Sequence, residues 1–560
     1  MERVWLKNYP AGVPADITVN PDESLLDMYE SVCRDYADKI AFSCMGVNLT
    51  YHKLWQLSSA FASFLQQDLG LVKGDRIGIM MPNILQYPVA LFGAFQAGLT
   101  VINLNPLDKA PSLKHELNDA AAKAVVVLEN FGSELQQILH ETSVKRVVIT
   151  SFGSLFPKWK RILINFFLRK IKNAVPEWHI PGHTGFRVAL ASGARQPYRK
   201  IKLTGQDMAF LQYTGGTTGI AKGVELSHSN MVANMHQAAT WVSPMTRKGV
   251  ERIITALPLY HIFSLLANCL VFMSIGGENV LIPDPRNIPG LVKELARKPF
   301  TGITGVNTLF NALLHNVRFR KLNFSHLKIS LGGGMAIQKP VADEWQQLTG
   351  CVICQAYGLT ETSPAVCINP PASTAFNGSI GLPISSTWVS IRDAAGNELP
   401  FGEIGELCVQ GPQVMQGYWQ RPAETEAVLR GGWLHTADGA YMDSDGYVYI
   451  VDRLKDMVIV SGFNVYPAEV EQLIKTIPGV NEVAVIGIPD RVHGEVVKAF
   501  VVLDKGTTLT AQEIKDFSHQ KLAAYKVPRE VEFCQSLPKS PVGKILKKDL
   551  RLQESNKKRI

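Results

Sequence analysis

The segment from Tyr213 to Gly223 constrains the fold of this chain most strongly, because glycine and threonine dominate it. It reads Tyr-Thr-Gly-Gly-Thr-Thr-Gly-Ile-Ala-Lys-Gly and follows the apolar run from Met208 to Leu211. Glycine allows positive φ and a close approach to a ligand. Successive N–H groups in such a turn form an anion-binding concavity, and threonine hydroxyls add donors. Because Lys222 adds a point charge, the segment predicts a strand followed by a polyphosphate-binding loop. A flexible surface turn is the alternative.

This loop lacks the features of two common nucleotide-binding loops. A Walker A loop has Ser or Thr after its lysine to bind Mg²⁺, whereas Gly223 follows Lys222 here. The G-x-G-x-x-G pattern of dinucleotide-binding folds is also absent from this loop. The sequence therefore predicts a nucleotide loop of another class.

The length of 560 residues predicts at least two domains. Between residues 40 and 107, β-rich runs alternate with helical ones, which predicts α/β layers with parallel sheets. From Gly402, short β runs and glycines predict a β-rich subdomain. The composition changes again near residue 455. We therefore predict a large N-terminal domain over residues 1–454 and a small, mobile α+β C-terminal domain over residues 455–560.

Individual elements follow from the same patterns. In the large domain we expect a hairpin over 40–51, a helix to residue 67, a helix near 89–93, and strands at 75–81, 100–104, 124–128 and 146–150. In the small domain we expect a helix with Pro467 at its first position, strands at 483–488 and 497–503, a helix over 511–524 and a strand over 528–533.

The positive charge of the chain is concentrated in one segment. The net charge is +8, and eight Lys/Arg residues with no Asp or Glu lie between Thr142 and Pro176. Such a local patch argues against nucleic acid and for one anionic surface or partner. Within it, apolar residues from Trp159 to Ile171 recur at near-helical spacing, opposite Arg161, Asn165, Arg169 and Lys172. Both a solvated helix with an inward apolar face and a membrane-surface helix fit this pattern.

The remaining composition indicates no disulfide framework and no membrane span. The eight cysteines are few, and the N-terminus lacks an apolar signal region, so we expect a cytoplasmic protein. Cys351 and Cys354 form a C-x-x-C without a second pair, in a run that predicts a buried strand. The charge-free windows 77–107 and 255–279 are long enough to span a membrane, but Pro, Asn, Gln, His and Gly interrupt them.

Six further motifs follow the loop in a fixed order. They are Leu257-Pro-Leu-Tyr-His261, Gly332-Gly-Gly-Met335, Tyr357-Gly-Leu-Thr-Glu361, Trp433-Leu-His-Thr-Ala-Asp438, Asp452-Arg-Leu-Lys-Asp456 and Pro538-Lys-Ser-Pro-Val-Gly-Lys544. Over nearly the whole chain this order resembles the adenylate-forming acyl-CoA synthetases, and among them the bacterial long-chain fatty acid–CoA ligases. The resemblance implies the adenylate-forming enzyme fold. It also implies activation of a fatty acid by ATP to acyl-AMP, with pyrophosphate release, followed by transfer to CoA.

The resemblance also implies a nucleotide site. The phosphate loop would hold the β- and γ-phosphates through Thr214, Gly215, Gly216, Thr217, Thr218, Gly219 and Lys222. The adenine would stack on Tyr357 and lie near Gly332, Gly333, Gly334 and Gly358. Thr360 would contact phosphate, and Glu361 would bind Mg²⁺, for which a carboxylate is a suitable hard ligand. Asp438 would accept hydrogen bonds from the ribose, helped by Arg453.

The reacting groups and partners are implied in the same way. Lys544 would neutralise the carboxylate and α-phosphate oxygens, His261 would lie near the acyl carboxylate, and residues 305–309 would line the acyl pocket. We expect Lys455 to be the hinge of the small domain, and we also place it, next to Arg453, among the nucleotide-binding residues. The expected cofactor is Mg²⁺, and the expected partners are ATP, CoA, a long-chain fatty acid and the inner face of an anionic membrane. A homodimer is also compatible with the sequence.

The sequence departs from the family pattern at Ala437, where glycine usually precedes the ribose-binding aspartate. Because alanine disfavours positive φ, we expect a shifted Asp438. Leu454 replaces a common basic residue. Two other functions remain open. An amino-acid-adenylating module would precede a carrier domain, for which the 16 residues after Lys544 leave no room. A membrane-bound fatty-acid-binding protein with vestigial motifs is the alternative from another class.

Overall fold

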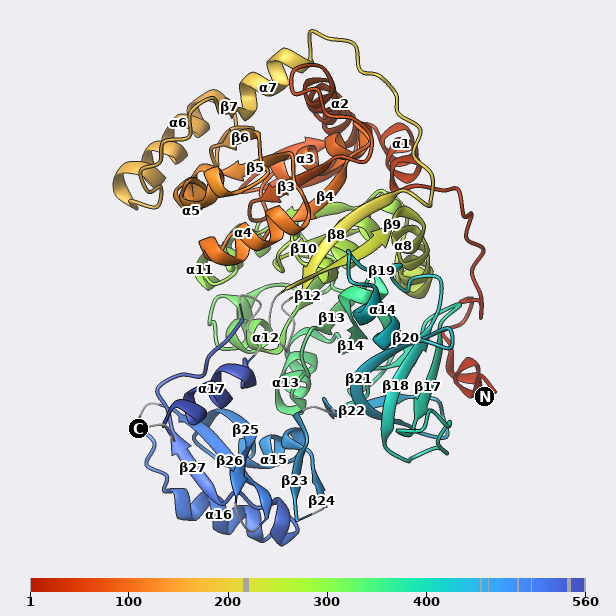
Figure 1. Cartoon of the computed structure of the whole chain (residues 1–560), viewed down its shortest axis with the longest axis vertical. Helices are drawn as coiled ribbons and strands as arrows, with labels where there is room; N and C mark the ends of the chain where they lie inside the picture. Colours follow the sequence, from red (N-terminus) through yellow and green to blue (C-terminus); the bar gives the residue numbers. More distant parts are fainter. Residues whose placement is uncertain are drawn as a thin grey trace. The chain divides into compact units, whose positions relative to one another are not determined.

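The computed structural model describes residues 2–214, 221–453, 456–461, 463–490, 493–504, 506–540 and 545–557. The chain divides into two compact units (Figure 1). The larger unit comprises Leu6–Trp388 and Gln410–Gly432, and the C-terminal unit comprises Met1–Trp5, Val389–Val409 and Trp433–Ile560. The domain boundary predicted between residues 454 and 455 lies outside the described residues, so it stays a prediction.

An eight-stranded sheet carries the predicted phosphate loop. Its order is β19-β9-β8-β4-β3-β5-β6-β7, and the pairs from β8 through β7 are parallel. The strands are β3 (Arg76–Met80), β4 (Thr100–Asn103), β5 (Ala124–Leu128), β6 (Arg146–Thr150), β7 (Thr184–Gly185), β8 (Met208–Thr214), β9 (Lys222–Ser227) and β19 (Gly417–Tyr418). The apolar runs predicted as β3 to β6 are confirmed.

A nine-stranded sheet forms the second layer of the larger unit. Its order is β16-β15-β14-β13-β12-β10-β11-β1-β2, and β14, β13, β12, β10, β11 and β1 run parallel. The strands are β1 (Ile40–Cys44), β2 (Val47–Thr50), β10 (Arg252–Thr255), β11 (Glu278–Leu281), β12 (Gly302–Gly305), β13 (Ile329–Gly333), β14 (Ile353–Gly358), β15 (Ala365–Ile368) and β16 (Leu382–Pro383). The hairpin predicted over residues 40–51 is the β1–β2 pair.

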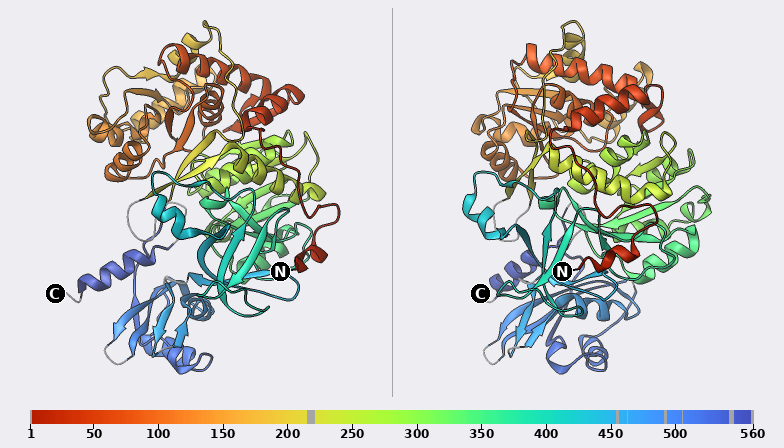
Figure 2. Two further views of the ribbon diagram at one scale, coloured as in Figure 1. Left: turned by 45° about the vertical axis from the view of Figure 1, so that its right-hand side comes forward. Right: turned by 90° about the vertical axis from the view of Figure 1, so that its right-hand side faces the viewer.

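Helices cover both sheets (Figure 2). The central one is α3 (Gln86–Gln96), all of whose residues are buried and which packs on α2 (Tyr51–Gln67). The other helices of the larger unit are α1 (Leu25–Asp35), α4 (Ala110–Asp119), α5 (Gly132–Ile138), α6 (Lys158–Phe166), α7 (Phe186–Gly193), α8 (His228–Val242), α9 (Ile262–Ser264), α10 (Val271–Ser274), α11 (Ile288–Leu295), α12 (Asn307–Leu314), α13 (Lys339–Thr349) and α14 (Pro422–Val428). The charge-free windows are thus divided among short strands and helices, and no helix in the described part of the chain is long and apolar enough to cross a membrane.

The C-terminal unit contains a β-rich part and an α+β part. The first is built on β17 (Trp388–Arg392), β18 (Gly405–Gln410), β21 (Trp433–Met442) and β22 (Val448–Arg453). The second contains β23 (Val458–Val460), β24 (Phe463–Val465), β25 (Val480–Asp490), β26 (Gly494–Leu503) and β27 (Glu530–Phe533), with α15 (Pro467–Lys475), α16 (Ala511–His519) and α17 (Lys547–Lys557). Pro467 does begin α15. However, α16 ends five residues before the predicted end, because the backbone is extended at Ala523, with a ψ of 146°, and a separate 3-10 turn follows over Ala524–Lys526.

Candidate active site

Three strands of the nine-stranded sheet end in glycine at the same edge. Gly305 of β12 is in register with Gly332 of β13, and Gly333 is in register with Ala356 of β14. A side chain on Gly333 would approach the Phe263 ring to 3.0 Å, so glycine here allows the chain to pack on itself. In contrast, Gly334 has a φ of 75° and open space where a Cβ would lie. Among these glycines, Gly334 is therefore best placed for a close approach by a ligand.

The loop after β14 presents Glu361. Tyr357 and Gly358 end β14, and Thr360–Thr362 form the short turn η8. A Cβ on Gly358 would lie 1.9 Å from the Pro364 carbonyl oxygen, which explains this glycine by packing alone. The main chain of Glu361 is fixed because its carbonyl accepts a hydrogen bond from the Met415 N–H at 2.8 Å. The Tyr418 hydroxyl donates to its carboxylate Oε1, also at 2.8 Å.

The predicted phosphate loop lies in the sequence between two paired strands, β8 and β9. Residues 215–220, which include the predicted Gly215, Gly216, Thr217, Thr218 and Gly219, lie outside the described residues. On either side of them, Thr214 of β8 is in antiparallel register with Lys222 of β9. The Lys222 Nζ lies 4.9 Å from the centroid of the Tyr418 ring. Tyr418 therefore contacts both Lys222 and Glu361, and brings two predicted site residues together.

Sequence reasoning missed Tyr418. Its Gly-Tyr-Trp setting marks it only as an aromatic residue near a glycine, and its partner Glu361 lies 57 positions away. No local pattern predicts such a contact.

His261 lies on a loop that buried polar side chains hold in place. The Asn83 amide donates to the carbonyls of Thr255 and Leu257, and its Oδ1 accepts from the Leu259 N–H. His261 itself caps α9, since its Nδ1 accepts the Phe263 N–H at 3.3 Å. Because Phe263 also lies against Gly333, this loop is adjacent to the glycine at the end of β13.

The predicted acyl-pocket segment, residues 305–309, runs from the end of β12 into the first turn of α12. Here the Asn307 Oδ1 accepts the Gln338 N–H at 2.9 Å. Leu309 is buried in the core that surrounds Phe310 and Trp345.

The two residues predicted to bind ribose, Asp438 and Arg453, lie on two strands of the C-terminal unit. Asp438 of β21 is buried and in register with Arg453 of β22. Ala437 adopts a φ of 58°, so the left-handed conformation that glycine would favour is present despite the alanine. The Glu406 carboxylate holds this residue, accepting the Ala437 N–H at 3.0 Å and contacting His435 Nδ1 at 2.7 Å.

Cys408 completes a small cluster with Glu406 and His435. Their potential ligand atoms all lie within 4.8 Å of one another. Since the carboxylate already pairs with both the imidazole and the Ala437 N–H, we interpret the cluster as support for Asp438.

The two predicted lysines of the C-terminal unit, Lys455 and Lys544, lie outside the described residues. The carboxylates on either side of Lys455 contact helix α17. The Arg551 Nη1 lies 2.7 Å from Asp456 Oδ1, and Lys547 Nζ lies 3.8 Å from Asp452 Oδ2. The N–H of Ala468 also donates to Asp452.

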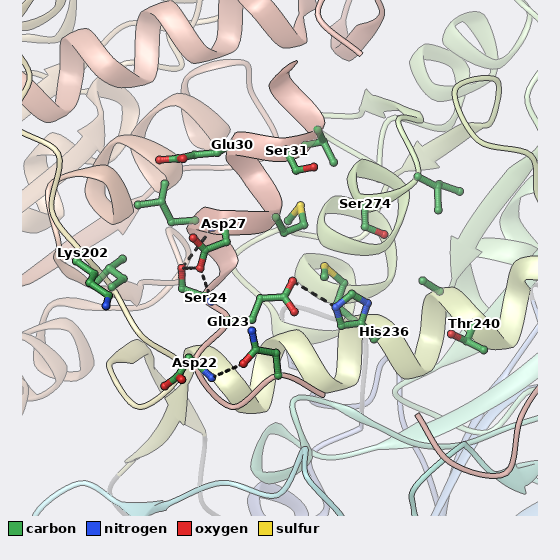
Figure 3. A pocket seen from close by; sticks show the side chains of 18 of the residues that line it. Asp22, Glu23, Ser24, Asp27, Glu30, Ser31, Lys202, His236, Thr240 and Ser274 are labelled. Atoms are coloured by element: carbon green, nitrogen blue, oxygen red, sulfur yellow. Dashed lines mark hydrogen bonds and ion pairs between the residues drawn. The ribbon is translucent and has the colours of Figure 1, made fainter. Parts of the chain in front are cut away.

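A cavity of about 1080 Å³ lies apart from these residues, between α1 and α8 (Figure 3). Glu23 and His236 point toward each other in it, with Oε1 3.5 Å from Nε2. Ser24 and Asp27 form the capping box of α1 beside them. None of the predicted site residues lines this cavity.

Helix α6 and the π-helical turn η4 (Phe167–Ile171) expose their apolar side. Six large apolar residues are exposed: Trp159, Ile162, Leu163, Phe166, Phe167 and Ile171. The polar side faces the protein instead, where Asn165 bonds to the Gly153 N–H and the Ser151 hydroxyl. Lys160 donates to the Met45 carbonyl, and Arg169 pairs with the buried Glu129. The inward apolar face considered from the sequence is therefore not present.

Comparison with known proteins gives one consistent family. The model of the AMP-binding enzyme family matches residues 29–419, and that of the AMP-binding enzyme C-terminal domain matches residues 469–544. A long-chain-fatty-acid–CoA ligase of Escherichia coli O6:H1 is 52% identical over 98% of both chains, and one of Bacillus subtilis is 35% identical over 100% of this chain and 99% of its own. Among solved structures, ATP-bound MatB from Rhodopseudomonas palustris has a TM-score of 0.78 at 28% identity, covering 94% of this chain and 98% of its own.

Proposed function

Because the chain belongs to the AMP-binding enzyme family, we propose that it is a long-chain fatty acid–CoA ligase that forms acyl-AMP and then acyl-CoA. The observation that carries the proposal is the 52% identity, over nearly the full length of both chains, to a ligase of that name. The contacts that link Lys222, Tyr418 and Glu361 fit the same chemistry, since a cation and a carboxylate lie together beside the phosphate loop.

The first step joins the fatty acid to AMP. A carboxylate oxygen of the fatty acid attacks the α-phosphorus of ATP, and the bond to pyrophosphate breaks. No protein nucleophile is needed, so the residues act by positioning and by stabilising charge. The phosphate loop and Lys222 would hold the β- and γ-phosphates, His261 would lie near the acyl carboxylate, and Lys544 would neutralise the oxygens around the α-phosphorus.

Glu361 fits a Mg²⁺ ion that accompanies ATP. Its carboxylate is a hard oxygen ligand, held in place by the Tyr418 hydroxyl and by the Met415 N–H on its main chain. The ion would offset phosphate charge when bound. Thr360, at the start of the same turn, would contact a phosphate oxygen.

The second step transfers the acyl group to CoA. The CoA thiol, which gives up its proton, attacks the acyl carbon, and AMP leaves with the oxygen that joined it to the acyl group. Lys544 must withdraw for the thiol to approach, and Lys455 would absorb the change in backbone angles as the hinge.

Two assays test the ligase proposal. With ATP, Mg²⁺ and palmitate, the protein should release pyrophosphate, and added CoA should yield palmitoyl-CoA and AMP in equal amounts. A series of fatty acids from C6 to C18 measures the preferred chain length. If palmitate binds but no pyrophosphate appears, the protein is a fatty-acid-binding protein and the proposal is wrong.

A second proposal concerns the site from which the enzyme takes its substrate, namely the surface of an anionic membrane on its cytoplasmic side. The exposed apolar side of α6 and η4 supports this proposal, because such a face lowers its free energy by entering the interfacial region of a bilayer. Basic residues in the same segment would add roughly 1 kcal/mol each near anionic lipid. Long-chain fatty acids also partition into bilayers, so enzyme and substrate would meet there.

The variant for this test must spare the cations that support the fold. Lys160 and Arg169 bond to the rest of the unit, whereas Lys158, Arg161 and Lys172 have no acidic partner within 4 Å among the described residues. Changing these last three to Glu should abolish sedimentation with phosphatidylglycerol vesicles at low salt. The control exchanges Lys293, Lys298 and Lys321 for Glu, with the same change in net charge. Equal sedimentation of both variants would refute the proposal.

A further inference from the structure

The side chain of Tyr418 lies between two parts of the proposed ATP site. Its hydroxyl donates to Glu361 Oε1 at 2.8 Å, and its ring lies under Lys222 Nζ, which is 4.9 Å from the ring centroid. We propose that Tyr418 is a positioning residue that fixes the Glu361 carboxylate and the Lys222 ammonium relative to each other for the magnesium complex of ATP. This inference rests on the proposed function, because it takes Glu361 as the residue that binds the metal.

The backbone around Tyr418 is held by the strand that ends the phosphate loop. Strand β19 pairs with β9, with Gly417 opposite Glu225 and Tyr418 opposite Val224. On either side, the Gln416 N–H donates to the Glu225 carbonyl at 3.1 Å and the Trp419 N–H to the Gly223 carbonyl at 2.8 Å. The backbones of Tyr418 and Lys222 are therefore set by the same strand pair, which places the ring within reach of the ammonium.

The residues after Tyr418 hold the other end of the loop through Asp119. Trp419 Nε1 donates to the Asp119 carbonyl at 2.9 Å, and Arg421 Nη2 donates to its Oδ1 at 3.2 Å. The second carboxylate oxygen accepts from the Tyr213 hydroxyl at 2.7 Å. Tyr213 immediately precedes Thr214, so the segment 418–421 is bonded directly to β9 and to the turn that carries Glu361, and is linked to β8 through Asp119.

The chemistry of Tyr418 and Glu361 determines which of the two donates the hydrogen bond. The phenol hydroxyl carries a hydrogen that it can donate, whereas a carboxylate oxygen accepts, so Tyr418 is the donor and Glu361 Oε1 the acceptor. A donor on one oxygen restricts rotation of the carboxylate. The metal would then meet an oxygen already oriented, which lowers the ordering cost of binding.

A purely structural role for Tyr418 is the alternative, and the two roles differ in what the hydroxyl controls. Tyr418→Phe keeps the ring under Lys222 and removes only the donor to Glu361. Tyr9→Phe is a matched control, because it also removes one tyrosine hydroxyl of the larger unit, the one that donates to the Pro383 carbonyl. A structural role predicts similar small losses of thermal stability for both variants and an unchanged affinity for metal.

The test measures Mn²⁺ binding to the full-length protein in the presence of ATP and without fatty acid. Free Mn²⁺ is quantified by its electron paramagnetic resonance signal. We expect Tyr418→Phe to weaken Mn²⁺ binding by about tenfold, the lower end of what a hydrogen bond to a charged group contributes. Tyr9→Phe should bind as wild type does. Tyr418→Leu, which also removes the ring from Lys222, should in addition weaken ATP binding measured without metal.

Glu361→Gln tests the metal-binding role of Glu361 separately from the positioning role of Tyr418. If it weakens Mn²⁺ binding while Tyr418→Phe does not, the positioning role is refuted and the metal role of Glu361 stands. If Glu361→Gln leaves Mn²⁺ binding unchanged, the metal role is refuted, and the positioning role with it. Equal weakening by Tyr418→Phe and Tyr9→Phe would also refute the positioning role, because it would show a general effect of losing a partly buried hydroxyl.

Discussion

Replacing Ala437 by glycine should raise the stability of the C-terminal unit relative to the same replacement at an ordinary alanine. Ala437 is exposed and has a φ of 58°, a left-handed conformation that costs an L-residue about 1–2 kcal/mol. Glycine removes this cost but increases the entropy of the unfolded chain, which lowers stability by about 0.4–1 kcal/mol. The free energy of unfolding should therefore rise by about 0.8 kcal/mol, within a range of about 0–1.6 kcal/mol.

The matched control is Ala395→Gly. Ala395 is also exposed, lies in the same unit and has no left-handed φ, so the change should only destabilise. Because the unfolded-state effect cancels between the two variants, their difference should equal the left-handed cost, about 1–2 kcal/mol. For a unit of about 150–250 residues each kcal/mol shifts the Tm by about 2–4 °C, which scanning calorimetry resolves. If both variants lose the same amount, Ala437 is not strained and the argument is wrong.

Three other outcomes are expected. Lys544→Ala should slow acyl-AMP formation by ~10²–10³, the usual effect of losing one electrostatic contact, and leave thioester formation from supplied acyl-AMP nearly normal. Lys548→Ala is the control, and equal loss in both half-reactions would contradict the role of Lys544 in adenylation. Lys455→Pro fixes φ at the hinge and should slow thioester formation far more than adenylation, whereas Lys455→Ala should not; stopped-flow assays of each half-reaction decide this. Burial raises the pKa of Glu116 from 4.5 to about 8, so its contribution to stability is fully present below pH 4.5 and is lost as pH rises to about 8. Glu116→Gln should therefore raise the Tm at pH 9 and change it little at pH 5, and an equal change at both values would refute the shift.

Much of the fold was predictable because the evidence for it is local. Runs such as Ala124–Leu128 are apolar throughout, as a parallel strand buried on both faces must be, and they form β5 as expected. Likewise, Gly334 directly follows the end of β13, and Pro467 is the first residue of α15.

The parts that the sequence did not predict depend on contacts between distant segments. The period of α6 separates an apolar side from a polar one, but the direction in which each side points is decided by Asn165, Lys160 and Arg169 and by their distant partners. The contact between Tyr418 and Glu361 is unpredictable for the same reason. At Ala437 the sequence predicted that alanine would avoid positive φ and shift Asp438, but the residue adopts a φ of 58°. Its N–H donates to the distant Glu406, a contact that the sequence does not indicate.

Because the apolar side of α6 faces outward, the hydrophobicity of this helix is separate from the stability of the fold, although the two are usually linked in a globular protein. In most helices, a more apolar face adds to the stability of the core, so its hydrophobicity cannot change without changing the fold. Here Trp159, Leu163 and Phe166 are exposed, while the helix is anchored by the hydrogen bonds of Asn165. Substitutions on that face can therefore tune adhesion and solubility independently of folding, and a polar version of α6 offers a direct route to a form that stays dispersed at high concentration.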